Sequence, residues 1–169
     1  MKKRIMAAIL AIVVAIGALG CAGLSVTPVK YDFESSKVFN KPQDEALLDI
    51  MDFFKGNGYA VNRNTHELII SDNILFSHEF GVHPHFEYAD CGSTKASSML
   101  SGLTGHLTIF IDNIPDGKSK VTITTRFWTD MMNINWMYQW NKVGESECFS
   151  TGALEKRILI YVEATRSTK

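Results

Sequence analysis

The strongest constraint on the fold is a pair of strand-like segments joined by a turn. Residues 120–128 alternate between apolar and polar side chains, and residues 106–112 form a second β-prone run just before them. The connection contains Pro115-Asp116-Gly117, in which proline presets a negative φ and glycine accepts a positive one. Because alternating side chains lie on opposite faces of a strand, the sequence predicts an antiparallel hairpin with one buried and one solvated face.

Helical periodicity marks two further segments. We expect one helix over residues 41–55, ended by Gly56-Asn57-Gly58, and a second helix that opens at Ser150-Thr151-Gly152. Their apolar residues recur at the spacing of one helix face. The two stripes consist of Leu47, Ile50, Met51 and Phe54 in the first helix and of Leu154, Ile158, Tyr161 and Val162 in the second.

Shorter β-prone runs supply the remaining strands. They cover residues 31–39 and 82–90, and a further hairpin turns at residues 62–65. Residues 72–73 are expected to be a break, residues 91–105 a loop, and residues 129–147 a long connecting segment. An antiparallel sheet of about four or five strands, with the N-terminal and C-terminal helices on one face, satisfies this order with short connections. The predicted class is α+β.

The first twenty residues have the composition of a secretion signal. Lys2, Lys3 and Arg4 form a charged start, and residues 5–19 carry no charge. This apolar stretch is too short to cross the hydrocarbon core of a bilayer, about 30 Å thick, comfortably. A small residue, Gly20, then precedes a cysteine.

This order resembles the lipobox of bacterial lipoproteins, in which the cysteine, here Cys21, is acylated and becomes the mature N-terminus. Ala18 replaces the leucine that the family prefers three positions before the cysteine. The resemblance implies a lipoprotein signal peptide at residues 1–20, a lipidated tether at 21–31 and a single α+β domain at 32–169. An ordinary transmembrane anchor or secretory signal is the alternative.

The residue after Cys21 and the balance of charges indicate where the protein is located and what it binds. Ala22 stands where lipoproteins retained in the inner membrane usually have aspartate, which implies delivery to the outer membrane, with the domain in the periplasm or at the cell surface. The chain has 17 Lys and Arg against 18 Asp and Glu, and loss of the signal peptide would remove three of the cations. Because nucleic acids favour basic proteins, we expect no nucleic-acid partner. We expect membrane attachment through the lipid anchor, with an envelope protein as a further partner.

Lipidation of Cys21 would leave Cys91 and Cys148 as an even pair. In an oxidising compartment such a pair most simply forms a disulfide. The sequence has no Cys-x-x-Cys spacing, so a structural bond is favoured over a redox-active one. A free thiol or a metal ligand is the alternative for each cysteine.

The order of elements over residues 32–166 resembles that of helix-grip-like outer-membrane lipoproteins, a class that includes small proteobacterial proteins. Cys91-Gly92 after a strand and the run from Cys148 to Gly152 before the last helix belong to this likeness. The likeness implies a fold and no activity. It assigns no functional residue beyond Cys21.

His83 and His85 are the residues most able to carry chemistry. In a strand they would share one face with Glu87, and imidazole and carboxylate groups are ligands for zinc or copper. Two histidines do not complete a four-coordinate site, and the sequence has no Gly-x-Ser-x-Gly nucleophile elbow. We expect no metal, no cofactor and no catalysis. A metal-binding or hydrolytic enzyme that uses the His83/His85 row is the alternative.

All the tryptophans lie between residues 128 and 140. Trp128, Trp136 and Trp140, together with Tyr138, form the candidate interface, because aromatic side chains are enriched in binding surfaces and at membrane interfaces. The alternative is that this segment closes one end of the core. The predicted function is an outer-membrane lipoprotein that acts as a binding or accessory module of the cell envelope. A carrier that holds an apolar ligand between sheet and helix is a further alternative.

Overall fold

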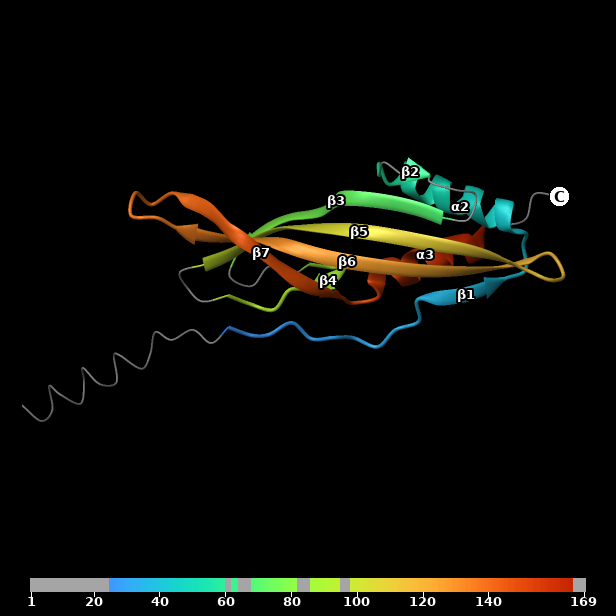
Figure 1. Cartoon of the computed structure of the whole chain (residues 1–169), viewed down its shortest axis with the longest axis horizontal. Coiled ribbons are helices and arrows are strands. Elements are labelled where there is room, and N and C mark those ends of the chain that lie inside the picture. The colour runs from blue at the N-terminus through green and yellow to red at the C-terminus, as the bar shows by residue number, and fades with distance from the viewer. Residues whose placement is uncertain (1–24, 60–61, 64–67, 82–85, 95–97, 166–169) are drawn as a thin grey trace, which may run out of the picture.

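The computed structural model describes residues 25–59, 62–63, 68–81, 86–94 and 98–165. Within them the elements are β1 (Ser36–Phe39), α2 (Gln43–Gly56), β2 (Asn62–Arg63), β3 (Leu68–Gly81), β4 (Ala89–Asp90), β5 (Ser98–Ile114), β6 (Lys118–Ile134), β7 (Trp140–Ser150) and α3 (Ala153–Ala164). Each pairing between these strands is antiparallel. The antiparallel sheet with two helices confirms the predicted α+β class, although the described sheet has seven strands, more than the sequence predicted (Figure 1).

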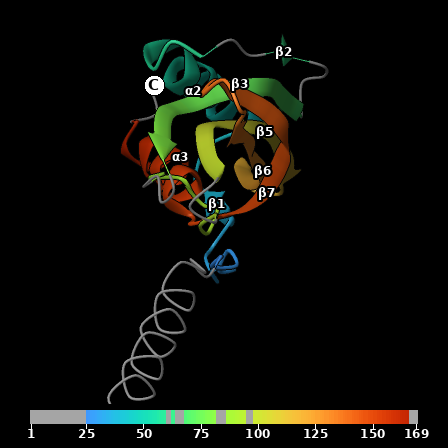
Figure 2. The ribbon, with the colours of Figure 1, turned by 90° about the vertical axis from the view of Figure 1, so that its left-hand side faces the viewer.

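Strand β6 is the central strand of the sheet and pairs with β1, β5 and β7. The strands are ordered β2-β3-β5-β6-β7-β4, and β1 pairs with the first part of β6 outside this path. The last part of β6, from Phe127 to Ile134, pairs instead with β7. Phe80 on β3 and Trp140 on β7 form an edge-to-face pair with ring centroids 5.5 Å apart, although β5 and β6 separate their strands. The sheet is therefore strongly curved at this end, as the view along its long axis shows (Figure 2).

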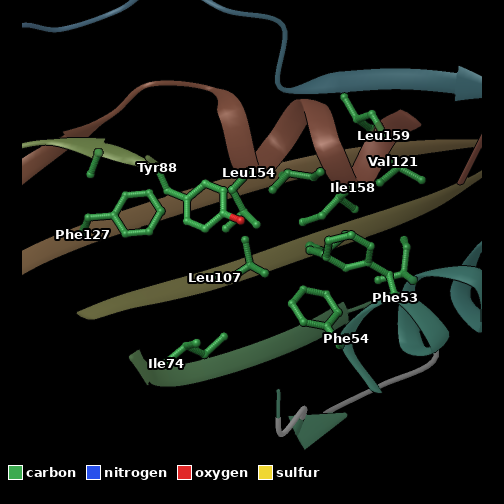
Figure 3. Close-up of a cluster of buried hydrophobic side chains, with 14 of the residues drawn as sticks. Phe53, Phe54, Ile74, Tyr88, Leu107, Val121, Phe127, Leu154, Ile158 and Leu159 are labelled. Atoms are coloured by element: carbon green, nitrogen blue, oxygen red, sulfur yellow. The ribbon is translucent and has the colours of Figure 1, made fainter. Parts of the chain in front are cut away.

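The core lies where the helices meet the strands. The helices contact one another, α2 contacts β5 and β6, and α3 contacts β1 and β6. Figure 3 shows Phe54 of α2, Ile158 of α3 and Leu107 of β5 gathered in this core. Burial of such side chains drives folding, at about 1.5–3 kcal/mol for each large one. The buried members of the predicted stripes are Leu47, Ile50, Phe54, Leu154, Ile158 and Val162.

Three residues at the edges of the two predicted apolar stripes differ from the prediction in their burial. Met51 is only half-buried and Tyr161 is exposed, whereas Phe53, which the pattern did not select, is buried. The Phe53 ring packs edge-on against Tyr161, with centroids 5.4 Å apart. Contact between the two helices therefore buries a residue that the periodicity of either helix alone would expose.

A buried lysine fixes the C-terminus of α3 to the start of α2. The Lys41 ammonium lies 2.7 Å from the Asp49 carboxylate and donates to the carbonyls of Val162 and Thr165 at 2.7 and 2.8 Å. The last carbonyls of a helix lack partners within the helix, and a cation there also complements the helix dipole. Lys41 thus donates hydrogen bonds to the free carbonyls at the C-terminal end of α3, and Asp49 of α2 pairs its charge.

A buried glutamate fixes the opposite end of α3. Glu155 lies in the first turn of the helix, and its carboxylate accepts hydrogen bonds from the hydroxyls of Ser150 on β7 and Thr125 on β6. An anion at this end also complements the helix dipole. Both ends of α3 are therefore tied to other elements of the domain.

Three predicted interruptions are strands in the structure. Residues 72–73 lie within β3, where the register with β5 shifts but the strand continues. Strand β5 begins at Ser98, so the second half of the predicted loop 91–105 is paired. The segment 129–147 consists of the end of β6, a turn and most of β7. These stretches are rich in Ser, Thr, Gly and Asn, and pairing with neighbouring strands rather than local periodicity makes them strands.

Two other predicted strands, 31–39 and 82–90, are shorter than expected, and part of the predicted turn 62–65 is a strand. Strand β1 covers only the last part of the predicted 31–39, and Asn62-Arg63, expected in a turn, form β2. The rest of that turn, 64–65, lies outside the described residues, as do 82–85 of the predicted strand 82–90. Of the described remainder, only Ala89–Asp90 form a strand, β4.

Candidate functional site

The turn between β6 and β7 presents the most exposed aromatic side chains of the described residues. Trp136 and Tyr138 are 85% and 86% exposed, and Ile134 and Met137 beside them are exposed as well. Figure 1 shows this turn projecting past the rest of the sheet at one end of the long axis. Single exposed apolar residues are ordinary, but a contiguous patch marks an interaction site. We call residues 134–138 the hairpin tip.

The hairpin tip has a fixed backbone. The side-chain oxygen of Asn135 accepts hydrogen bonds from the backbone N–H groups of Met137 and Gln139, each at 2.9 Å. The backbone carbonyl of Asn135 accepts from the N–H of Tyr138 at 3.0 Å, and its N–H donates to the Gln139 carbonyl at 2.9 Å. Asparagine commonly closes turns in this way. The exposed side chains therefore extend from an ordered base.

Tyr138 adopts a backbone conformation that its side chain disfavours. Its φ is 58°, in the left-handed region, which costs a residue other than glycine about 1–2 kcal/mol. Strain of this kind persists where the surrounding structure imposes it, and it clusters at functional sites. Because the side chain is exposed, burial does not offset this cost. The position therefore favours a role for the side chain of Tyr138 rather than for the turn.

The stem of the hairpin holds the other two predicted interface residues. Trp140 is half-buried, and its ring packs against Phe80. Trp128 is half-buried on β6 and lines an open pocket of about 540 Å³. The structure therefore divides the four aromatic residues of the candidate interface. Trp136 and Tyr138 lie in the hairpin tip, and Trp128 and Trp140 lie in the stem.

Charged side chains begin only at the base of the hairpin. Residues 131–141 contain no charged residue. Next to them, the Lys142 ammonium lies 2.7 Å from the Asp130 carboxylate and 2.8 Å from that of Glu145. The hydrogen bond with Asp130, followed by that with Glu145, raises the pKa of Lys142 and so favours its charged form. We call Asp130, Lys142 and Glu145 the charged collar, above which the hairpin is uncharged.

Residues 26–31, predicted as part of the tether, run along the domain beside the loop that follows β4. The N–H of Val26 donates to the Ser93 hydroxyl at 3.0 Å, and the N–H of Ser93 donates back to the Val26 carbonyl at 2.9 Å. Further along, the N–H of Val29 donates to the Asp90 carboxylate at 3.2 Å. We call residues 26–31 the strap, because these hydrogen bonds hold it on the domain.

Gly92 and a disulfide fix the loop that receives the strap. Gly92 has a φ of 67°, and a Cβ at this position would lie 2.1 Å from the carbonyl oxygen of Val26. Only glycine fits so close an approach. Cys91 and Cys148 are bonded, with their Cα atoms 4.3 Å apart, which confirms the predicted pair. Because Cys148 lies in β7, the loop that holds the strap is covalently linked to the strand that leads from the hairpin tip.

The predicted histidine row lies largely outside the described residues. This applies to His83 and His85, while Glu87 is described and exposed. Among the residues that the structure describes, no group of three or more His, Cys, Asp or Glu side chains is placed to hold a metal ion. The ring of His106 lies on β5, with its Nε2 atom 3.1 Å from the Thr108 hydroxyl. The expectation for the His83/His85 row stays a prediction.

No protein-family model, curated protein or solved structure matches this chain. Over the described part of the chain, no helix is long and apolar enough to cross a membrane, and Cys21 lies before that part begins. Function must therefore be argued from the site. Sequence reasoning selected the aromatic residues of the hairpin tip, but it did not select Asn135 and assigned no role to Gly92. The signal for Asn135 was present, because an asparagine between β-prone runs indicates a turn.

Proposed function

We propose that this protein is a lipid-anchored lipoprotein of the outer membrane that acts by binding, as an accessory module of the cell envelope, and not by catalysis. The hairpin tip carries the proposal. Its aromatic side chains are exposed, Asn135 fixes its backbone, and Tyr138 is held at an unfavourable φ. A turn that only joined two strands would be more stable with glycine or asparagine at that position.

The anchoring part of the proposal rests on the N-terminal sequence. A charged start, an uncharged stretch over residues 5–19 and the pair Gly20-Cys21 follow in the order of a lipoprotein signal. Cys21 lies four residues before Ser25, where the described chain begins. A chain of that length reaches at most about 14 Å, so an acylated Cys21 would hold the domain close to the membrane.

The finer architecture is also part of the proposal. We propose that both helices cover one face of the sheet, in a helix-grip-like arrangement. The support is that α2 and α3 contact one another and that both contact β6. Glu155 adds to it, because this buried residue of α3 receives hydrogen bonds from side chains of β6 and β7.

Replacing Cys21 with serine tests the anchor. The native protein should carry the added mass of acyl chains and fractionate with the outer membrane. The Cys21→Ser variant should be released or remain unprocessed. The double variant Cys91→Ser/Cys148→Ser is the matched control, because it removes cysteines and leaves the lipobox intact. Unchanged membrane fractionation of Cys21→Ser, with no acyl mass on the native protein, would contradict the proposal.

Comparing Trp136→Ala with Trp140→Ala tests the binding role. Trp136 is so exposed that its truncation should change the free energy of unfolding by no more than about 0.5 kcal/mol. Trp140→Ala should lower the melting temperature, because it removes the contact with Phe80. Crosslinking to envelope components in cells should be lost in Trp136→Ala at an unchanged melting temperature. A large fall in melting temperature for both variants would mean that the segment is core, and the proposal would fail.

A further inference from the structure

We infer that the hairpin tip binds the lipid bilayer itself, by entering the headgroup region of the membrane that carries the acyl chains of Cys21. The inference rests on the proposed anchoring at Cys21 and adds a second, noncovalent contact with the same membrane. Its support comes from the side chains of the tip, from the length of the uncharged hairpin and from the position of the strap.

The side chains of the hairpin tip suit a membrane interface. Tryptophan and tyrosine combine an apolar ring with a polar group, and they are enriched where hydrocarbon meets water. Trp136 and Tyr138 are of this kind, with Met137 between them. Because residues 131–141 carry no charge, entry of the tip would remove no charged group from water. The charged collar marks the level at which the uncharged part ends.

The turn at the opposite end of the molecule is charged, in contrast to the hairpin tip. The turn between β5 and β6, at residues 115–117, lies at the other end of the long axis (Figure 1). The charged residues in and around that turn are Asp112, Asp116, Lys118 and Lys120. A hairpin turn in water is usually polar, and this turn follows that rule. The turn between β6 and β7 therefore contains exposed aromatic residues, whereas the turn between β5 and β6 contains none.

The length of the uncharged hairpin matches the depth of a membrane interface. Asn133 and Asn141 lie opposite one another, and the next pair toward the tip is Ile134 with Trp140. From Asp130, in the charged collar, to Ile134, the last residue of β6, the chain advances four residues, about 13 Å at the rise of a strand, and the turn lies beyond Ile134. Interfacial elements bury their apolar side about 5–10 Å into the boundary between headgroups and acyl chains. The tip can therefore be covered by lipid while the charged collar stays in water.

The strap begins toward the end of the long axis at which the hairpin tip lies (Figure 1). Figure 1 shows the first described residues, in blue, toward the end of the long axis where the turn between β6 and β7 projects. Val26 is held by its paired hydrogen bonds with Ser93, and Cys21 precedes it by only a few residues. A bilayer that holds Cys21 is thus close to the tip, which favours lipid over a protein as its occupant.

Quenching by brominated lipid tests the inference. The full-length, lipidated protein is reconstituted in vesicles of phosphatidylethanolamine and phosphatidylglycerol, with or without phosphatidylcholine brominated on its acyl chains. Bromine quenches tryptophan fluorescence only at close range, so the brominated vesicles should quench Trp136. Most of this quenching should be lost in Trp136→Phe. It should be retained in Trp128→Phe, the matched control, because Trp128 lies in the stem.

Tyr138→Gly provides a variant whose folding is not in doubt, because glycine accepts the φ of 58° at this position. Its melting temperature should equal or exceed that of the native protein. In the same brominated vesicles, quenching of Trp136 should nevertheless be weaker, because one of the two aromatic contacts with lipid is gone. Undiminished quenching in Tyr138→Gly would contradict the role assigned to the tyrosine side chain.

Two outcomes would overturn the inference without touching the anchor. One is equal emission of the acylated native protein in brominated and ordinary vesicles. The other is a specific protein adduct, in place of lipid adducts, from a photo-crosslinking residue at position 136 in cells. That adduct would leave the proposed binding role standing. Absence of acyl chains by mass spectrometry would instead contradict the proposed function, so the two failures are distinguishable.

Discussion

Replacing Lys41 with methionine should destabilise the domain far more than replacing Lys37 with methionine. The two lysines make ion pairs of nearly equal length, because the Lys41 ammonium lies 2.7 Å from Asp49 and the Lys37 ammonium 2.8 Å from Glu163. They differ in burial. The side chains of the first pair are 7% and 16% exposed, and those of the second are 35% and 58% exposed. The comparison therefore contrasts a buried lysine with an exposed one at nearly the same ion-pair distance.

The expected loss of stability in Lys41→Met follows from the groups that would lose their partner. Its three donor hydrogens are used by the Asp49 carboxylate and by the carbonyls of Val162 and Thr165. Removing one partner of a buried ion pair costs roughly 3–5 kcal/mol, because the other charge is left unpaired. Asp49 lies close to the surface, so we expect about 3 kcal/mol, the low end of that range. The exposed pair of Lys37 should contribute about 0.5 kcal/mol or less.

Thermal unfolding followed by circular dichroism, with the disulfide intact, measures this difference. At about 2–4 °C for each kcal/mol, Lys41→Met should lower the midpoint by roughly 10 °C and Lys37→Met by no more than about 2 °C. The double variant Lys41→Met/Asp49→Leu should recover much of the loss, because no unpaired charge remains. Equal midpoints for the two single variants would refute the reasoning. So would a double variant that is no more stable than Lys41→Met.

The disulfide and Gly92 give two further predictions. Replacing Cys91 and Cys148 with serine should lower the free energy of unfolding, measured in urea, by about 4 kcal/mol. This is the loop-closure value for a separation of 57 residues. Two freely alkylatable thiols in the natively purified protein would contradict the bond. Gly92→Ala should displace the strap and speed amide exchange at Ser93, because the new Cβ has no room. Gly56→Ala is its control, because no atom lies within 4 Å of the added Cβ, and equal exchange in both variants would argue against the role of Gly92.

Local periodicity predicted the elements that bury one continuous face. Leu47, Ile50 and Phe54 recur at helical spacing in α2 and are buried. Val121 and Ile123 alternate with polar residues in β6 and are buried as well. In each case the pattern repeats within a single element, so residues close in sequence determine which face turns inward. The two helices and the central hairpin could therefore be predicted from the sequence.

The long strands were missed because their partners are distant in sequence. The first part of β5, from Ser98 to Gly105, is rich in Ser, Gly and Thr, yet β3 and β6 pair with it on either side. Gly105 looks like a loop residue but is needed in this strand, because a Cβ there would lie 2.7 Å from Phe127 and 2.8 Å from Phe76. The two rings come from other strands, so a local pattern does not reveal the requirement.

At the candidate site, composition indicated the segment but not its geometry. The concentration of tryptophan marked residues 128–140. Its division into tip and stem depends on the hydrogen bonds of Asn135 and on the contact between Phe80 and Trp140. The first is a local turn signal that the sequence contains. The second requires the sheet to curve until β3 and β7 approach, which depends on the whole fold.

The strap, the disulfide and β7 form one path from the N-terminal chain to the hairpin tip, and this path bears on what a weak tip contact can do. If Cys21 is acylated, the acyl chains supply the affinity for the membrane. The tip then meets a surface to which the protein is already attached, so its contact is effectively intramolecular and needs little affinity of its own. The hydrogen bonds between Val26 and Ser93 hold the strap on the loop that the bond between Cys91 and Cys148 links to β7. The tip would therefore set the orientation of the domain rather than its attachment, and changes at Trp136 should alter quenching without releasing the protein from the membrane.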